Sequence, residues 1–256
     1  MLRRKVALID FKENVLNIAM ILAGGKGERF GSDIPKQFME VLGKPVIVYT
    51  IEAFQNHSEI DLIQVVCIES HVEYLTELVN QYKLSKVKWI VKGGENFHCS
   101  VVNGIDHLQE FCKENDMVSI HFGASPFVTD DIISDGFVEC EKHGNAISTT
   151  PFYLLSGIKT TEHMSNESID RYTIACMNSP HTFKYELVKR IYEEGRKKDL
   201  LNQIDSGITN LMYALGWSIY FSKGSQTNIK ITTKEDLKLF EGYVLSALKA
   251  NGELNL

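Results

Sequence analysis

Apolar and polar positions change period from one segment of the chain to the next. Short continuous apolar runs predict buried parallel strands, and four of them occur, at residues 18–23, 62–68, 87–93 and 117–123. Between them, apolar residues recur every three or four positions, which predicts amphipathic helices over residues 45–54, 72–82 and 100–112. This alternation predicts an α/β fold with a mostly parallel, doubly wound, Rossmann-like sheet covered by helices on both faces.

The pattern changes after residue 145. Segments 146–161 and 169–183 are β-prone, and a polar turn is expected between them at residues 162–168. We therefore expect a projecting β-arm at about residues 147–180, inserted into a single domain that spans residues 18–256. Apolar side chains along such an arm need a partner to cover them, which predicts a homodimer through the arm. The remaining segments predict a helix over 185–198, a helix into a strand over 211–224, and a short strand into a terminal helix over 228–250.

Composition excludes several classes of partner. The chain has 27 Lys and Arg against 33 Asp and Glu, a balance that disfavours nucleic acid and anionic membrane surfaces. No apolar stretch reaches transmembrane length.

Five cysteines stand singly without metal-ligand spacing, which indicates a reducing, cytoplasmic compartment. Residues 1–17 are expected to be an extension rather than a signal peptide, because Asp10, Lys12 and Glu13 interrupt their apolar run.

The segment ILAGGKGERFGSDIPKQF, residues 21–38, follows the first predicted strand. It places Gly24, Gly25 and Gly27 close to the cations Arg29 and Lys36. Glycines let backbone N–H groups approach an anion, and cations stabilise its charge, so the segment predicts a phosphate-binding loop. A dinucleotide fingerprint would need a glycine where Phe30 stands, and the ending of a P-loop is absent.

Several motifs together resemble one family. They are ILAGGKGERFGSDIPKQF, LGKPVIVYTIEAF, GGENFHCSVVNGI, IHFGASPFV, IDR and GSQTNIKITTKEDLKL. In this order and spacing they resemble the cytidylyltransferases that act on sugar-alcohol phosphates, a family that includes the methylerythritol-phosphate and ribitol-phosphate enzymes. The resemblance covers nearly the whole chain from residue 18. It implies transfer of CMP from CTP to a polyol or sugar phosphate with release of pyrophosphate, for surface polysaccharide or isoprenoid precursor synthesis, with Mg²⁺ as the expected cofactor.

The resemblance also implies roles for individual residues. The cations expected to act on the triphosphate are Arg29, Lys36 and Lys230. The residues expected to bind the nucleotide are Ala23, Gly24, Gly25, Gly27, Gly93, Gly94, Ser100 and Gly123. The residues expected to bind the acceptor, from the neighbouring subunit, are Lys159, Asp170 and Arg171. Three structural alternatives stay open: Ser100 as a helix N-cap, Lys230 as a solvated strand-edge lysine, and Arg171 as the partner of Asp170 in a surface salt bridge.

The chain departs from the family pattern at several positions. Phe97 and Ser125 replace arginines, Phe122 and Thr227 replace acidic residues, and Gly157 replaces a threonine. No protein carboxylate is therefore expected to hold the metal, which leaves the phosphates and water as Mg²⁺ ligands. These losses keep a second hypothesis open, a catalytically silent homologue that binds a nucleotide or a partner. A third is a nucleotidyltransferase that uses a different NTP, because the predicted base pocket is mostly backbone.

Overall fold

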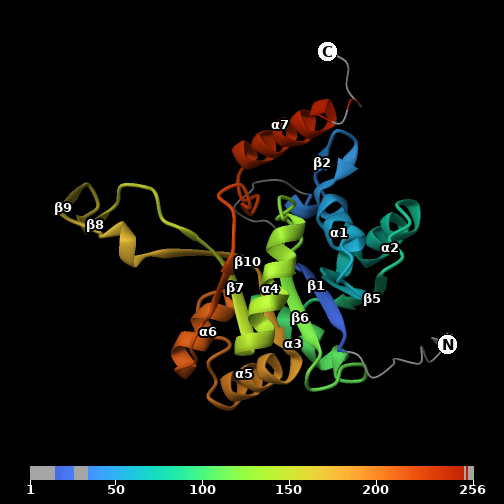
Figure 1. The fold of residues 1–256 in the computed structure, drawn as a ribbon, viewed down its shortest axis with the longest axis horizontal. Coiled ribbons are helices and arrows are strands. Elements are labelled where there is room, and N and C mark those ends of the chain that lie inside the picture. Colours follow the sequence, from blue (N-terminus) through green and yellow to red (C-terminus); the bar gives the residue numbers. More distant parts are fainter. Residues whose placement is uncertain (1–14, 26–33, 251, 253–256) are drawn as a thin grey trace.

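The computed structural model describes residues 15–25, 34–250 and 252, and its centre is a seven-stranded sheet (Figure 1). The strand order is β11-β7-β10-β6-β1-β4-β5. The strands are β1 (Asn17–Ala23), β4 (Leu62–Cys67), β5 (Val87–Lys92), β6 (Met117–Phe122), β7 (Asn145–Pro151), β10 (Ala175–Lys184) and β11 (Phe221–Lys223). Strand β10 runs antiparallel to β6 and β7, and the other neighbouring pairs are parallel. The predicted mostly parallel α/β fold is confirmed.

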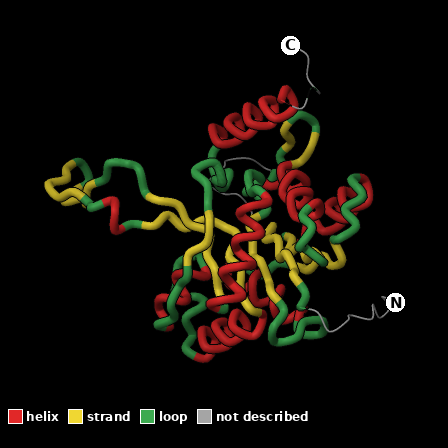
Figure 2. Tube along the Cα trace, viewed as in Figure 1, coloured by secondary structure: helices red, strands yellow, loops and turns green. Residues whose placement is uncertain are grey.

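Helices cover both faces of this sheet (Figure 2), which explains why β1 is apolar at successive positions. Ala19 and Ile21 of β1 pack in the core formed with α1, α2 and α4, whereas Ile18 and Met20 pack in the core formed with α3, α5 and α6. The helices are α1 (Val46–Asn56), α2 (Val72–Gln81), α3 (Phe97–Leu108), α4 (Asp130–His143), α5 (Tyr185–Lys197), α6 (Ile208–Leu215) and α7 (Lys234–Ala250). Short 3₁₀ turns lie at η2 (Lys36–Phe38), η3 (Glu69–His71) and η4 (Arg171–Thr173).

Several elements differ from the sequence-based predictions. Helix α4 was not predicted, nor was the small hairpin of β2 (Glu40–Val41) and β3 (Lys44–Pro45). The polar turn predicted at residues 162–168 is confined to Glu162 and His163, because β9 (Met164–Ser168) pairs with β8 (Gly157–Thr161). The short strand predicted at the start of 228–250 is wrong, since that segment has no regular secondary structure and pairs with no strand among the described residues.

The segment between β7 and β10 leaves the central sheet and projects from the body of the molecule (Figure 1). Its outer part is the β8/β9 hairpin, and η4 lies on the return path. Gly157 begins this hairpin, and a Cβ at that position would lie 2.4 Å from Ser165 Oγ. The close approach of the two strands is therefore the physical reason for a glycine there. Both β8 and β9 are exposed along their whole length.

Helix α7 lies at the end of the molecule opposite α5 (Figure 1), and a third core joins it to the loop after β6. Phe240 of α7 packs edge-on against Phe127 and Tyr49, at ring-centroid distances of 5.0 and 5.1 Å. This packing holds the segment before α7 close to the carboxyl ends of the central strands. Within the described part of the chain, no helix combines the length and the apolar character needed to cross a bilayer.

Candidate functional site

Two glycine segments, Gly24–Gly25 and Gly93–Gly94, lie side by side at the carboxyl edge of the central sheet. Gly24 follows β1, and Gly93 follows β5. A Cβ placed on Gly93 would lie 3.4 Å from the Cα of Gly24 and 3.2 Å from Ser100 Oγ. Strand β4 stands between β1 and β5, and its Cys67 carbonyl accepts a bond of 2.7 Å from Gly93 N. Only residues without side chains allow this approach of backbone to backbone.

Ser100 joins the second glycine segment to helix α3. Its Oγ accepts a hydrogen bond from Gly94 N at 3.0 Å and donates one to Asn96 O at 2.9 Å. The N-cap of α3 is Asn96, whose side chain accepts from Cys99 N at 2.8 Å. The alternative of Ser100 as the helix N-cap is therefore wrong, because it lies one turn inside the helix. Its hydroxyl instead holds the loop that precedes the helix.

Gln37 holds the first glycine segment in place, a role that the sequence analysis missed. Its Nε2 donates to Ala23 O and to Gly25 O, each at 2.9 Å, and the side chain is buried. Gln37 lies in η2, directly after Lys36, so one short turn both supports the loop and carries a cation. In the sequence, Gln37 stands between Lys36 and Phe38, and its burial, which shows its role, becomes visible only in the structure.

Lys36 is distant in sequence from Lys230, but it lies near Asp236, a carboxylate that binds the segment directly after Lys230. Asp236, near the start of α7, accepts bonds from the N–H groups of Thr232 and Thr233 at 2.7 and 2.9 Å. Partial burial acts to raise the pKa of the Asp236 carboxyl, but these N–H donors and the charge of Lys36 hold it below its ordinary value. Lys36 is thus within electrostatic reach of the segment that carries Lys230.

The backbone around Lys230 is anchored on both sides. Asn228 Nδ2 donates to Ser179 O at 2.7 Å, and Ile231 N donates to Ala124 O at 2.8 Å. These bonds fix the segment over the carboxyl end of β6 and the middle of β10. The Nζ atom of Lys230 lies 3.6 Å from the ring centroid of Phe122, the last residue of β6. This segment forms no strand, so Lys230 does not lie at a strand edge, but its side chain is exposed, as the alternative of a solvated lysine expected.

The remaining predicted site residues fall into two groups. Gly27 and Arg29 lie outside the described residues, so their predicted roles stay predictions. Ala23 ends β1, and its carbonyl also accepts a bond from Ile68 N at 3.2 Å. Gly123 packs against β1, where a Cβ would lie 3.2 Å from Leu22 O, and its own carbonyl accepts from Thr50 Oγ1 at 3.1 Å. Both residues are therefore buried parts of the scaffold beneath the site.

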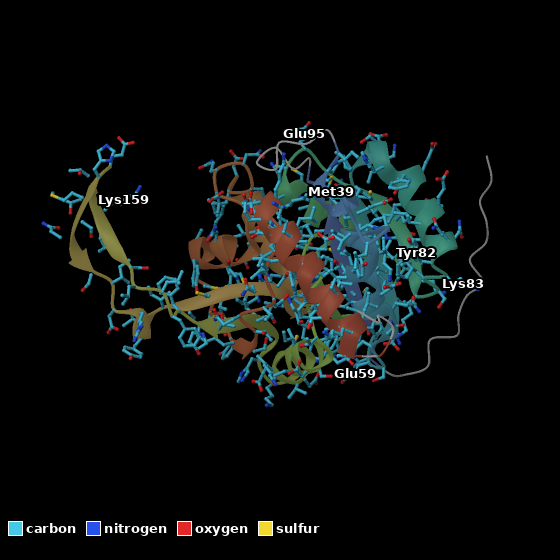
Figure 3. The ribbon with its side chains drawn as sticks, turned by 90° about the horizontal axis from the view of Figure 1, so that it is seen from above. Met39, Glu59, Tyr82, Lys83, Glu95 and Lys159 are labelled. Atoms are coloured by element: carbon cyan, nitrogen blue, oxygen red, sulfur yellow. The ribbon has the colours of Figure 1, made fainter. Side chains whose placement is uncertain are left out.

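The predicted acceptor residues lie on the arm, apart from the glycine segments of the same chain. Figure 3 shows Lys159 on the arm, away from the body of the molecule that carries Met39 and Glu95. Asp170 caps η4 by accepting from Tyr172 N at 3.0 Å. Arg171 donates to Tyr153 O at 3.4 Å, and its guanidinium lies 5.3 Å from the ring centroid of Tyr172. The described ion pairs do not join Arg171 to Asp170, so the surface salt bridge is not formed here.

Cation-ligating side chains do not gather at this edge of the sheet. Among residues 15–25, 34–250 and 252, no group of three or more His, Cys, Asp or Glu side chains could hold a metal ion. The carboxylate of Asp236 already accepts backbone N–H groups, and Phe122 offers a ring. The described side chains therefore do not fit a protein-held Mg²⁺.

A cavity of about 300 Å³ lies elsewhere, between α3 and α5, with Asp106 and Arg196 in its wall.

Gly94→Ala is expected to destabilise the site and the fold. The added Cβ would lie 2.4 Å from Cys99 Cβ and 2.7 Å from its carbonyl carbon, so loop and helix must separate. Overpacking of this kind costs roughly 1–3 kcal/mol. Chemical denaturation should show the loss of unfolding free energy. Gly25→Ala is the matched control, because a Cβ at Gly25 would meet no atom of the described residues within 4 Å. Equal stability of the two variants would contradict this packing.

Comparisons with known proteins agree on one family. The family model described as IspD, 2-C-methyl-D-erythritol 4-phosphate cytidylyltransferase, matches residues 17–246. A ribitol-5-phosphate cytidylyltransferase of Lacticaseibacillus paracasei is 39% identical over 227 residues, which are 88% of this chain and 97% of that protein. A 2-C-methyl-D-erythritol 4-phosphate cytidylyltransferase of Clostridium tetani is 37% identical over 230 residues, with 89% and 90% covered.

Solved structures show the same fold. The 4-diphosphocytidyl-2C-methyl-D-erythritol synthase of Anaerococcus prevotii superimposes with a TM-score of 0.75 at 20% identity, covering 90% of this chain and 99% of that one. The 2-C-methyl-D-erythritol 4-phosphate cytidylyltransferase of Francisella tularensis gives a TM-score of 0.70 at 23% identity, with 93% and 100% covered. On the family model and the relatives above 30% identity, this chain belongs to the IspD family of cytidylyltransferases.

Proposed function

We propose that this chain transfers CMP from CTP to a polyol phosphate, giving a CDP-polyol and pyrophosphate. The observation that carries the proposal is the meeting of the two glycine segments and the Lys36 and Lys230 segments at one edge of the sheet. In open parallel sheets, ligands bind at this carboxyl edge. The printed activities of the relatives supply the reaction type.

In the proposed reaction, an oxygen of the acceptor phosphate bonds to the α-phosphorus of CTP, and the bond from that phosphorus to the α,β-bridging oxygen breaks. The acceptor phosphate is already ionised, so the step needs no strong general base. It needs two anions to be held together while charge develops on the leaving pyrophosphate. Lys36 and Lys230 would supply that stabilisation, with Arg29 as a predicted third cation. The backbone of Gly24, Gly93 and Gly94 would read the cytosine edge.

Ribitol 5-phosphate is the first acceptor to test. Two relatives, 39% and 34% identical to this chain, are both described as ribitol-5-phosphate cytidylyltransferases. That acceptor would place the product in surface polysaccharide synthesis, whereas methylerythritol phosphate would place it in isoprenoid precursor synthesis. We propose that Lys159, Asp170 and Arg171 reach the acceptor in the neighbouring subunit, since they lie on an arm that projects from their own. A cytoplasmic location stays a prediction, supported by five free cysteines.

Mg²⁺ is part of the proposal as a companion of CTP rather than a resident of the protein. The described residues do not supply a carboxylate set for it, so the phosphates and water would be its ligands. The residues of this chain would then act on the nucleotide through their own charges and backbone N–H groups. Binding of Mg²⁺ to the protein in the absence of CTP would contradict the proposal that only the phosphates and water are its ligands.

We propose that the arm forms a homodimer, and Leu154→Asp with Leu155→Asp should produce a monomer. Leu155 is 92% exposed and Leu154 69% exposed, and Tyr172 nearby is 86% exposed. Apolar side chains at such exposure are stabilised by a partner surface. Size-exclusion chromatography with light scattering measures the change. His163→Gln, at a polar exposed position of the same hairpin, is the control and should remain dimeric. A monomeric wild type at the concentrations used for activity would contradict the proposal.

The decisive experiment measures pyrophosphate release from each NTP with Mg²⁺ and ribitol 5-phosphate or methylerythritol 4-phosphate. We expect pyrophosphate release with CTP and with none of the other NTPs, and a CDP-polyol as product. Two outcomes would overturn this. Tight CTP binding without release, on both acceptors, would favour the silent homologue that the replacements Phe97, Phe122, Ser125 and Thr227 motivate. Pyrophosphate release with a different NTP would favour a nucleotidyltransferase that uses that NTP. The predicted base site allows this, because it is mostly backbone.

A further inference from the structure

The aromatic ring of Phe122 faces the charged group of Lys230. The Nζ atom lies 3.6 Å from the ring centroid, well inside the roughly 6 Å within which the negative face of a ring attracts a cation. Phe122 is half-buried at the end of β6, so part of the ring is withdrawn from water. A lysine stem has four flexible carbons and gives the ammonium no intrinsic direction. A ring face at this distance restricts where the charge can lie.

The backbone bonds beside Lys230 leave the side chain as the main source of freedom. Asn228 is buried and bonded to Ser179 O, and Ile231 is fully buried and bonded to Ala124 O. The backbone at Lys230 is therefore held in place on both sides. What remains adjustable is the path of the stem across the end of β6, where Phe122 stands.

Two further rings, from other elements, set the orientation of Phe122. Phe97, the first residue of α3, lies with its ring centroid 6.0 Å away and its plane tilted by 46°. His181 of β10 lies 6.3 Å away at 76°, an edge-to-face contact. Aromatic pairs prefer such offset and edge-on arrangements. Phe122 is thus held between α3 and β10 while its face is turned to Lys230.

The neighbouring histidines do not add positive charge at neutral pH. Burial lowers the pKa of His121 to about 4 and that of His181 to about 4, and the charge of Lys230 acts in the same direction on both. Both rings are therefore neutral when Lys230 is charged. Of these three groups, the lysine carries the only cation presented to Phe122.

We propose that Phe122 is a positioning residue, which holds the ammonium of Lys230 at the carboxyl edge of the sheet, and that Phe97 orients its ring. The contact would confine a positive charge at the place where the triphosphate is proposed to bind. Its consequence for the reaction rests on the proposed function. Its structural part, the cation held on the ring face, can be tested without turnover.

The first test reads the contact directly by NMR. Protons above a ring face are shifted upfield, so the ε-CH₂ protons of Lys230 should be upfield of those of other lysines, with Lys230→Arg identifying the signal. Phe122→Leu should return the signal to the range of other lysines, and Phe122→Tyr should keep it upfield. A Lys230 signal that does not differ between the wild type and Phe122→Leu overturns the proposal.

The second test separates ring electrostatics from packing. Mono-, di- and trifluorophenylalanine at position 122 weaken the negative ring face in steps with little change in size. CTP affinity by calorimetry and kcat/KM should fall with each step, and Phe122→Leu should lower both roughly three- to tenfold. The same analogues at Phe127, which packs on Phe240 and Tyr243, are the matched control and should change neither. Equal values along the series at position 122 would mean a packing role and overturn the proposal.

A double-mutant cycle completes the test. In a Lys230→Ala background, Phe122→Leu should add less than about twofold, because the group it positions is gone. A full additional loss would show that Phe122 acts independently of Lys230. Thermal unfolding of each variant identifies any that fail to fold. If the wild type binds CTP but transfers no CMP, the proposed function fails, while the NMR signal and the CTP affinity still decide whether Phe122 positions Lys230.

Discussion

Replacing Lys230 with alanine is expected to lower kcat/KM for CMP transfer by about a hundredfold, with a similar loss for Lys36→Ala. Lys36 lies within electrostatic reach of Asp236, and Lys230 lies on the segment before that residue, at the carboxyl edge of the sheet where the triphosphate is proposed to bind. Each would stabilise charge that grows as pyrophosphate leaves. Removal of one preorganised electrostatic donor typically costs 10²–10³ in rate. Initial rates of pyrophosphate release at several CTP concentrations measure the effect.

Lys223→Ala is the matched control for both lysine variants. Lys223 also lies near the end of the chain, on β11, but its Nζ pairs with Asp131 at 2.6 Å and both side chains are more than half exposed. Exposed pairs of this kind contribute little, so activity should stay within about twofold of the wild type. The proposed roles of Lys36 and Lys230 would be contradicted if all three variants behaved alike. Loss of CTP affinity with unchanged kcat would limit the two lysines to binding.

Lowering the pH from about 6.5 to 4 is expected to destabilise the fold strongly. Burial lowers the folded-state pKa of His121 and of His181 to about 4, below the 6.5 of an exposed histidine. The unfolded chain therefore binds more protons in this window, so stability present above pH 6.5 is lost as pH falls toward 4. Each histidine contributes on the order of 3 kcal/mol. Burial also lowers the pKa of His98 and of His107, which adds in the same direction.

The geometry of His121 explains why protonation is unfavourable. Its Nε2 lies 2.8 Å from Ser125 O, where a ring N–H donates, and its Nδ1 is buried with no hydrogen-bond partner among the described residues. A proton added at Nδ1 would place an unpaired charged donor in the core. Urea unfolding at pH 7.5, 6, 5 and 4.5 should show the slope, and His121→Gln or His181→Gln should reduce it. His163→Gln on the arm is the control. An unchanged slope in both buried variants would refute the assignment.

The sequence pattern predicted the central strands and most of the helices because their signals are local. Residues 18–23 are apolar at successive positions because β1 is covered on both faces, and a strand buried in this way shows that pattern wherever it occurs. Elements with weaker local signals were missed or misplaced. Met164–Ser168 is polar and exposed, so nothing in its composition distinguished the strand β9 from a turn. Residues 228–232 have strand composition, but Ile231 bonds to the loop after β6 rather than to a strand.

By itself, the sequence predicted the parallel α/β core from its apolar period and a phosphate-binding loop from the glycines and cations of residues 21–38, whereas Lys230 was proposed through the resemblance of its motif to a family. Only the tertiary structure decided which of these groups meet. The glycine segments after β1 and β5 touch, and Lys230 lies on the ring of Phe122, although 107 residues separate those two in sequence. It also assigned Ser100 to the loop and Asn96 to the cap. Contacts of this range depend on strand order and helix packing, which no local pattern encodes.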